Sequence, residues 1–209
     1  MLIPFDYLCK KYSLRPPGVL HLGANEGQEA PAYAAAGIER VVWVEALPQV
    51  FDVLKQKIAP IRGSVALLAC LSDVDNQQVD FHVASNDGQS SSFLELGTHA
   101  QAHPTVCYVK TIRMATIRVD TLLRQNNLEV GPGWLLNVDL QGAELLALRG
   151  MGDLLKQFDS VYIEVNEKEL YIGCPSAAQI DSWLGNRGFE RKEIKMTGSG
   201  WGDAFYLRV

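Results

Sequence analysis

Two carboxylate side chains near the ends of apolar runs are the strongest candidates for chemistry. Asp139 directly follows one such run, and Glu164 lies near the end of the next. If both runs are strands of a parallel sheet, the two carboxylates meet at the edge where open α/β sheets bind ligands. A carboxylate there can act as a general base toward a hydroxyl. With an amide oxygen from Gln141 or Asn166 the two could instead bind Mg²⁺ or Mn²⁺, and Asp139 could also cap the following helix.

A glycine-containing turn follows the first apolar run. Two glycines in the segment Gly23–Gly27 allow a ligand to approach the backbone closely. The dinucleotide fingerprint is incomplete, because Asn25 and Gln28 take the places of its second and third glycines. Glu45 follows about twenty residues later, the separation at which an acidic residue accepts both ribose hydroxyls. The pattern favours a nucleoside ligand without a pyrophosphate; a plain tight turn and a strand-end glutamate are the alternatives.

The histidines give a less specific signal. His99 and His103 are four residues apart, which on a helix would place both on one face as metal ligands. Gly97 and Pro104 argue against a long helix there, so His103 is also a candidate base or substrate-loop residue. His21 lies in the first apolar run and is expected to contact the cofactor or to pack in the core.

The elements that position these residues alternate between apolar strands and amphipathic helices. This order predicts an α/β fold with a parallel sheet and helices on both faces. The expected strands are Val19–Leu22, Val41–Val44, Val65–Leu68, Val79–Val83, Val106–Ile112, Leu135–Val138, Val161–Val165 and a closing antiparallel pair, Phe189–Met196 and Ala204–Val209. The expected helices are Glu29–Ala36, Pro48–Ile58, Val119–Gln125, Ala143–Leu148 and Ala177–Arg187, the last opened by a capping box from Ser176 to Gln179.

Residues 73–118 interrupt this alternation with polar clusters around two of the strands. They predict an inserted hairpin and a long loop, Ala84–Thr105, of the kind that is usually functional. We place this insert on the substrate side of the site. Because no linker or repeat divides the chain, residues 1–209 are expected to form one domain.

Composition and charge exclude several classes of protein. The chain has 209 residues, of which 47% are hydrophobic, enough to build its own core. A net charge of −5 provides no basic surface for nucleic acid. No signal peptide or membrane-spanning run is visible, and the four cysteines fit reduced, buried thiols. These features predict a cytoplasmic protein.

Five motifs, taken in chain order, resemble those of the FkbM-type methyltransferases, class I enzymes that use S-adenosylmethionine. They are Leu22–Gly27 (LGANEG), Leu71–Asp73 (LSD), Ser90–Ser92 (SSS), Asn137–Glu144 (NVDLQGAE) and Gly202–Phe205 (GDAF). The resemblance implies a three-layer, Rossmann-like fold with a seven-stranded, mostly parallel sheet and an antiparallel last strand. It also implies O-methylation of a sugar or similar hydroxyl, with a divalent metal left open.

The resemblance, together with the positions of Glu164, His103 and His21 described above, assigns roles to individual residues. The expected cofactor contacts are His21, Gly23, Ala24, Asn25, Gly27, Glu45, Ala46, Leu71, Ser72 and Asp139. Among them the glycine turn would line the methionine end, Glu45 would hold the ribose, and Leu71 and Ser72 would border the adenine. The expected catalytic residues are Asp139, Glu164 and His103, and the first two are also the candidate metal ligands. Three positions depart from the family pattern: His21, Asn137 and Gln141 are neutral where Asp, Lys and Glu are common.

Two other functions are left open by the sequence: an NAD-dependent oxidoreductase and a non-catalytic nucleoside-binding module. N-methylation is disfavoured, because no Asn/Asp-Pro-Pro-Tyr/Phe run follows Val138. A glycan acceptor would be presented by a partner or fused glycosyltransferase, and Trp201 is expected near the site.

Overall fold

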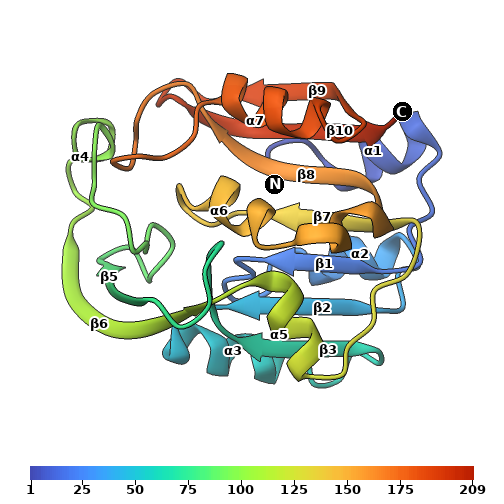
Figure 1. Cartoon of the computed structure of the whole chain (residues 1–209), viewed down its shortest axis with the longest axis horizontal. Coiled ribbons are helices and arrows are strands. Elements are labelled where there is room, and N and C mark those ends of the chain that lie inside the picture. Colours follow the sequence, from blue (N-terminus) through green and yellow to red (C-terminus); the bar gives the residue numbers. More distant parts are fainter.

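A seven-stranded sheet forms the centre of the molecule. The computed structural model describes all 209 residues. The strands of this sheet are β1 (Val19–Leu22), β2 (Val41–Glu45), β3 (Ser64–Leu68), β7 (Trp134–Val138), β8 (Phe158–Asn166), β9 (Phe189–Met196) and β10 (Trp201–Arg208). They lie in the order β3-β2-β1-β7-β8-β10-β9, as Figure 1 shows. Strand β10 is antiparallel to both of its neighbours, and all other pairs are parallel. The predicted mostly parallel sheet with an antiparallel last strand is confirmed.

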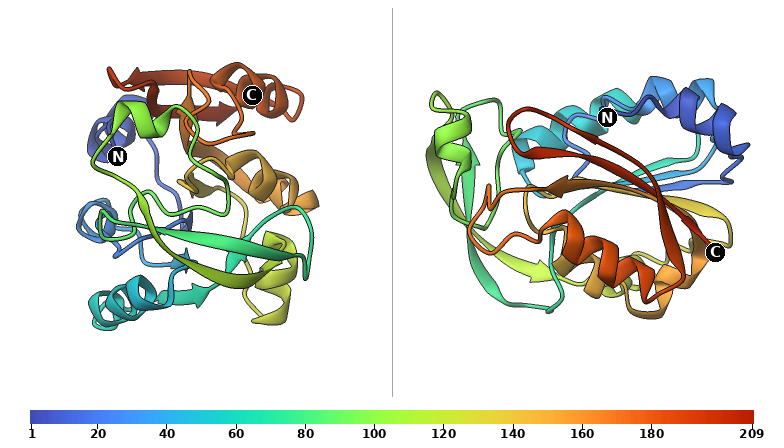
Figure 2. Two further views of the ribbon diagram at one scale, coloured as in Figure 1. Left: turned by 90° about the vertical axis from the view of Figure 1, so that its left-hand side faces the viewer. Right: turned by 90° about the horizontal axis from the view of Figure 1, so that it is seen from above.

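Helices cover both faces of this sheet and make three layers (Figure 2). One face carries α1 (Phe5–Tyr12), α2 (Ala30–Ala35) and α3 (Pro48–Ile58), which share a cluster of 16 buried apolar residues with the sheet. The other face carries α5 (Val119–Gln125), α6 (Glu144–Arg149), a 3-10 helix (Gly152–Gln157) and α7 (Ala177–Gly185), with a cluster of 26. Successive side chains of a strand point to opposite faces, so Val19 joins the first cluster and Leu20 the second. The central strands β1, β2 and β7 are therefore buried along their whole length.

The insert, residues 73–118, builds a second sheet beside the carboxyl ends of β1, β2 and β7 (Figure 1). Strands β5 (Gln78–Ala84) and β6 (Tyr108–Ile117) form the predicted antiparallel hairpin, and β6 also pairs with β4 (Cys70–Leu71). Its long loop contains one helical turn, α4 (His99–Ala102), and is held by isolated bridges from His82 to Ser92 and from Leu96 to Tyr171. The loop is thus fixed against both the hairpin and the main body.

Some elements differ from the sequence prediction. Helix α1 is not signalled by a long periodic pattern, because it has only eight residues and is stabilised by packing, as in the contact of Phe5 with Tyr33. Strand β6 runs on to Ile117 rather than ending at Ile112, since its pairing with β5 reaches Ala115 and its end pairs with β4. Strand β10 begins at Trp201 rather than Ala204. The capping box that opens α7 is confirmed.

The cysteines are only partly buried. Cys9 and Cys70 are buried as predicted, whereas Cys107 is exposed and Cys174 is half-buried. Cys107 lies directly before β6. The prediction of four buried thiols is therefore wrong for Cys107, which is exposed. None of the helices has the length and apolar character that crossing a membrane requires.

Candidate active site

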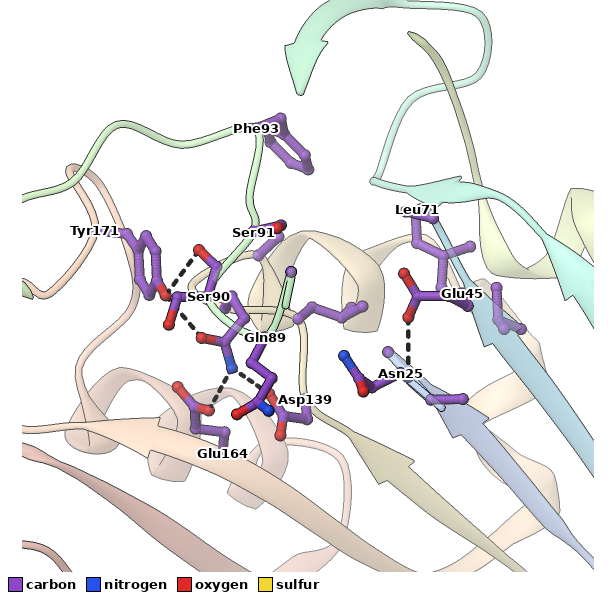
Figure 3. A pocket seen from close by; sticks show the side chains of 18 of the residues that line it. Asn25, Glu45, Leu71, Gln89, Ser90, Ser91, Phe93, Asp139, Glu164 and Tyr171 are labelled. Carbon is purple, nitrogen blue, oxygen red and sulfur yellow. Dashed lines mark hydrogen bonds between the residues drawn. The ribbon is translucent and has the colours of Figure 1, made fainter. Parts of the chain in front are cut away.

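A cavity of about 510 Å³ opens at the carboxyl ends of the central strands. It lies where the strand order reverses, because β1 leads on to β2 at one side and β7 leads on to β8 at the other. The turn after β1, the end of β2, the loop after β7 and the insert all contribute to its lining. Figure 3 shows Asn25, Glu45 and Leu71 on one side of the cavity, with Asp139, Glu164 and Tyr171 on the other.

The glycine turn, Gly23–Gly27, is set by a close approach between two loops. Gly23 has a φ of +80°, and a Cβ built on it would lie 1.7 Å from the backbone oxygen of Asp139. Asn25 also has a positive φ, and its side-chain oxygen accepts hydrogen bonds from the Glu26 backbone and the Gln28 side chain. The turn after β1 and the loop after β7 therefore pack directly on one another, so a ligand in the turn lies next to Asp139.

Glu45 is buried at the end of β2, with 8% of its surface exposed. Its two carboxylate oxygens accept hydrogen bonds from the backbone N–H groups of Asn25, at 2.9 Å, and Leu47, at 2.8 Å. Burial raises the pKa of Glu45, and these backbone hydrogen bonds oppose the rise. The side chain is thus held rigidly between the glycine turn and the start of α3, and it lines the cavity. An exposed strand-end glutamate is excluded.

Asp139 and Glu164, which we call the carboxyl pair, are joined by one amide. The Nε2 atom of Gln141 donates to Asp139 Oδ1 at 2.6 Å and to Glu164 Oε2 at 2.9 Å. Glu164 is 5% exposed, and its burial, followed by the negative charge of Asp139, raises its pKa well above the usual range. Asp139 is exposed on the cavity wall. Partial desolvation by the surrounding protein raises its pKa too, opposed by hydrogen bonds from Glu164 and Gln141. Burial and the charge of Asp139 therefore favour the protonated form of Glu164 more strongly than that of Asp139.

The loop that carries Asp139 is shaped by Glu144. This residue is fully buried, and its Oε1 atom accepts hydrogen bonds from the backbone N–H groups of Leu140 and Gly142, both at 3.0 Å. Burial raises the pKa of Glu144 to about 7. The N-cap residue of α6 is Ala143, and no side chain caps it, so Asp139 does not serve as the helix cap.

A polar network continues from the carboxyl pair to the insert. The hydroxyl of Tyr171 donates to Gln141 Oε1 at 2.7 Å and lies 3.4 Å from the backbone oxygen of Ser90. The Ser90 hydroxyl is 3.2 Å from His99 Nε2, and the ring of His103 lies beside that of His99, with 4.9 Å between centroids. Burial lowers the pKa of His99. Both histidines line the cavity, at the end formed by the insert.

The donors around the carboxyl pair do not fit a metal ion. Nowhere in the 209 residues are three His, Cys, Asp or Glu side chains grouped to hold one. Gln141 directs its nitrogen toward the pair, and its oxygen is engaged by Tyr171. An amide nitrogen is not a ligand for Mg²⁺ or Mn²⁺, which take oxygen donors. His99 and His103 also lack a third ligand.

Comparison with known proteins identifies the family. The sequence profile described as the methyltransferase FkbM domain matches residues 21–191, from the middle of β1 into β9. This chain belongs to the FkbM methyltransferase family. It is similar to a protein named 2-O-methyltransferase NoeI from Sinorhizobium fredii (strain NBRC 101917 / NGR234), with 25% identity over 173 residues, 79% of this chain and 70% of the relative. It is thus a methyltransferase that depends on S-adenosylmethionine.

Solved structures show that this FkbM protein shares the class I methyltransferase fold. A SAM-dependent methyltransferase from Aquifex aeolicus matches with a TM-score of 0.54 and 10% identity, over 100% of this chain and 91% of that one. A magnesium protoporphyrin IX methyltransferase from Synechocystis PCC 6803, solved with bound SAM, matches with a TM-score of 0.53 and 13% identity, over 98% and 76% of the two chains.

Most of the residues predicted to bind the cofactor line the cavity of this FkbM protein. His21, Gly23, Ala24, Asn25, Glu45, Ala46, Leu71 and Asp139 line it, as do the predicted catalytic residues Glu164 and His103 and the aromatic residue Trp201. Gly27 and Ser72 do not. A Cβ on Gly27 would lie 2.8 Å from Leu54 of α3, and the Ser72 hydroxyl is 3.4 Å from the Asp73 carboxylate.

His21 both lines the cavity and packs in the core. Its Nδ1 atom is 3.3 Å from the Tyr33 hydroxyl, and its ring lies 5.2 Å from the ring of Trp43. Complete burial lowers its pKa to about 4, so the imidazole is neutral. Asn137, the second departure from the family pattern, donates to the same Tyr33 hydroxyl at 2.7 Å. The two neutral residues therefore belong to one buried polar group.

The sequence did not identify three residues of the site. They are Glu144, Tyr171 as the hydrogen-bond donor to Gln141, and Gln89, whose side chain reaches toward Asp139 in Figure 3. Little in the sequence indicates the role of Glu144. A glutamate on the first turn of a helix is expected to be exposed, whereas Glu144 is buried. Tyr171 and Gln89 lie in irregular segments, where no periodicity predicts which side chains turn inward.

Proposed function

We propose that this protein transfers a methyl group from S-adenosylmethionine to a hydroxyl oxygen of a sugar. The observation that carries the proposal is the carboxyl pair, which lies in the cavity beside the glycine turn. A sugar hydroxyl is a weak nucleophile at neutral pH and needs a base within hydrogen-bond reach. The relative named 2-O-methyltransferase supports oxygen as the atom that is methylated.

The residues present fit the cofactor. A cavity of about 510 Å³ is within the range of small-molecule sites. In our proposal the backbone of the glycine turn holds the methionine end, Glu45 accepts the ribose hydroxyls, and Ala46 and Leu71 border the adenine. Glu45 suits this role because its carboxylate is already oriented by two backbone N–H groups and keeps further lone pairs free. The cofactor supplies a methyl group on a positively charged sulfur.

Asp139 is the residue we assign to the acceptor. In our proposal Asp139 is the ionised member of the carboxyl pair, so it can accept a hydrogen bond, and then the proton, from the acceptor hydroxyl. Its raised pKa makes it a stronger base than an aspartate in water. Glu164 keeps its proton and holds Asp139 in place. His103, at the insert end of the cavity, is positioned for the acceptor rather than for the reacting oxygen, and no step is assigned to a metal ion.

The charge of the cavity supports a neutral acceptor. Glu29, Glu45, Asp139 and Glu164 line it together with histidines, and its lining includes no lysine or arginine. Such a lining attracts the positive sulfur of the cofactor and offers no guanidinium or lysine ammonium to a phosphate; the amino group of Met1, which also lines the cavity, is 3.6 Å from Glu29. Membership of the FkbM family sets aside the NAD-dependent oxidoreductase. A non-catalytic nucleoside-binding module is the alternative that an activity measurement must decide.

The experiment follows the transferred group. S-adenosylmethionine with a deuterated methyl group is incubated with the protein and a panel of neutral oligosaccharides and glycolipids, and the products are analysed by mass spectrometry. We expect deuterated methyl ethers, formed 10²–10⁴-fold more slowly by Asp139→Asn, since roughly this factor is lost with a general base.

The control variant is Asp153→Asn, which changes an aspartate whose side chain is 91% exposed. It should leave the rate unchanged, as should added EDTA. An unchanged rate in Asp139→Asn rejects our assignment of Asp139. Binding of S-adenosylhomocysteine with no transfer to any hydroxyl in the panel contradicts the proposed function.

A further inference from the structure

Tyr171 is packed tightly against the loop that carries the carboxyl pair. Only 1% of its surface is exposed. Gly142 has a φ of +98°, and a Cβ built on it would lie 2.9 Å from the Cβ of Tyr171. The bridge from Leu96 to Tyr171 fixes the backbone of this tyrosine to the insert. Its hydroxyl therefore has little freedom to move relative to Gln141.

The Gln141 amide is asymmetric, and its two ends face different partners. Its oxygen only accepts hydrogen bonds and its nitrogen only donates them. The nitrogen lies 2.6 Å from Asp139 Oδ1 and 2.9 Å from Glu164 Oε2, so each of its two hydrogens has a carboxyl oxygen to bind. The oxygen lies 2.7 Å from the Tyr171 hydroxyl, which is its donor. Rotating the amide by half a turn would place oxygen against oxygen at both carboxyl groups.

We propose that Tyr171 is a positioning residue, whose hydroxyl holds the Gln141 amide with both N–H groups toward the carboxyl pair. The inference rests on the proposed function only for its catalytic consequence, since the hydrogen bonds are independent of the acceptor. Because N–H donors favour the charged form of a carboxylate, the fixed amide favours ionisation of Asp139. Tyr171 thus acts on the proton of the pair without contact with either carboxylate.

Removal of the hydroxyl leaves the amide oxygen without its donor. The amide is then free to turn its oxygen toward the pair, and a protonated carboxyl becomes the favoured partner for that oxygen. As the pH rises, Asp139 will therefore lose its proton at a higher pH than in the wild type. The hydroxyl's other neighbour, the Ser90 backbone oxygen, is at 3.4 Å and is the weaker acceptor.

The test is a titration that needs no acceptor. Side-chain carboxyl groups are labelled with ¹³C, the signals of the pair are assigned from Asp139→Asn and Glu164→Gln, and their shifts are followed against pH. We expect Tyr171→Phe to raise the midpoint at which Asp139 ionises by about one pH unit, a tenfold change in proton affinity. The matched control is Tyr108→Phe, since that hydroxyl donates to the Leu94 backbone oxygen at 2.7 Å, also in the insert loop.

An unchanged midpoint in folded Tyr171→Phe overturns the proposal, and so does an equal rise in Tyr108→Phe, which would indicate a general loosening of the insert. If Tyr171→Phe fails to fold, the wild-type protein decides. We then expect two distinct Gln141 side-chain amide protons that exchange slowly with water and shift as the pair titrates. A rapidly exchanging amide contradicts the proposal.

The result is separable from the proposed function. When an acceptor has been found, Tyr171→Phe should move the acid limb of the kcat profile to higher pH and leave the KM for S-adenosylmethionine unchanged. An unshifted midpoint with methyl transfer intact rejects the role of Tyr171 alone. A shifted midpoint with no hydroxyl methylated retains that role and rejects the function.

Discussion

At the scale of single residues, the site depends on buried carboxyl groups that have different tasks. Glu45 binds two backbone N–H groups, Glu144 closes the loop after β7, and the carboxyl pair faces the cavity. Sequence position made Glu45 and the pair candidates, because each lies at or near the carboxyl end of a strand. It did not predict the role of Gln141, because its partners are brought together only by the folded loops.

The stability of the protein should depend on the protonation of Glu144. Its pKa is about 7 in the folded chain against 4.5 ordinarily, so its stabilising contribution is complete below pH 4.5 and is lost as the pH rises through 7. Glu144→Gln stays neutral and keeps an oxygen for the two backbone donors. We expect the melting temperature of Glu144→Gln to rise relative to that of the wild type between pH 5 and pH 8. The corresponding change in the free energy of unfolding is a few kcal/mol, at about 1.4 kcal/mol per pKa unit.

Calorimetry across this pH range checks the expectation. Glu39→Gln, at an exposed glutamate before β2, controls for the substitution itself. A constant difference between Glu144→Gln and the wild type from pH 5 to pH 8 would show that burial does not raise the pKa of Glu144.

At the scale of elements, the central strands were predictable and the insert was only partly so. Strands β1, β2 and β7 are buried throughout and mostly apolar because helices cover both faces, which leaves a clear signal in the sequence. Strand β6 lies on a half-exposed sheet and alternates, so its end was misplaced by five residues, at Ile112 instead of Ile117. The loop geometry that orients Gln89 and Tyr171 has no periodic signature.

The contact between the turn after β1 and the loop after β7 can be tested with two glycines. Gly23 and Gly37 have similar φ values, +80° and +74°, but a Cβ on Gly23 would meet the Asp139 backbone at 1.7 Å, whereas Gly37 has nothing within 4 Å. Gly37→Ala should cost about 1 kcal/mol, from backbone strain alone. Gly23→Ala should cost several-fold more and abolish binding of S-adenosylhomocysteine.

Thermal unfolding and isothermal titration calorimetry of both variants separate backbone strain from steric overlap. Equal losses of stability, with ligand binding retained in Gly23→Ala, would mean that the two loops do not need their close approach.

At the scale of the whole molecule, the cavity joins segments from nearly the entire length of the chain. Its lining extends from the residues before α1 to Trp201, so a bound ligand links the central sheet to the insert. A ligand that binds only the folded protein at 100 times its dissociation constant adds about 2.7 kcal/mol of stability. For a chain of this size that corresponds to roughly 5–11 °C in melting temperature.

We expect S-adenosylhomocysteine to produce this shift and NAD at the same concentration to produce none. Glu45→Gln should reduce the shift, whereas Glu39→Gln, at an exposed glutamate outside the cavity lining, should not. An equal shift with NAD, or a full shift in Glu45→Gln, would contradict the assignment of the nucleoside end of the cavity.

The placement of β10 constrains the order in which the chain can assemble on the ribosome. Strand β9 is made before β10 but lies outside it, at the edge of the sheet, with β10 hydrogen-bonded on both sides. When β9 emerges, the open edge of the sheet is β8, whose neighbour must be a strand not yet synthesised. Pairing of β9 with β8 would be a kinetic trap. We therefore expect β9 to pair first with β10, and the resulting hairpin to add to β8 through β10. Because Trp201, the first residue of β10, lines the cavity, we expect the ligand site to be complete only after this hairpin has joined the sheet.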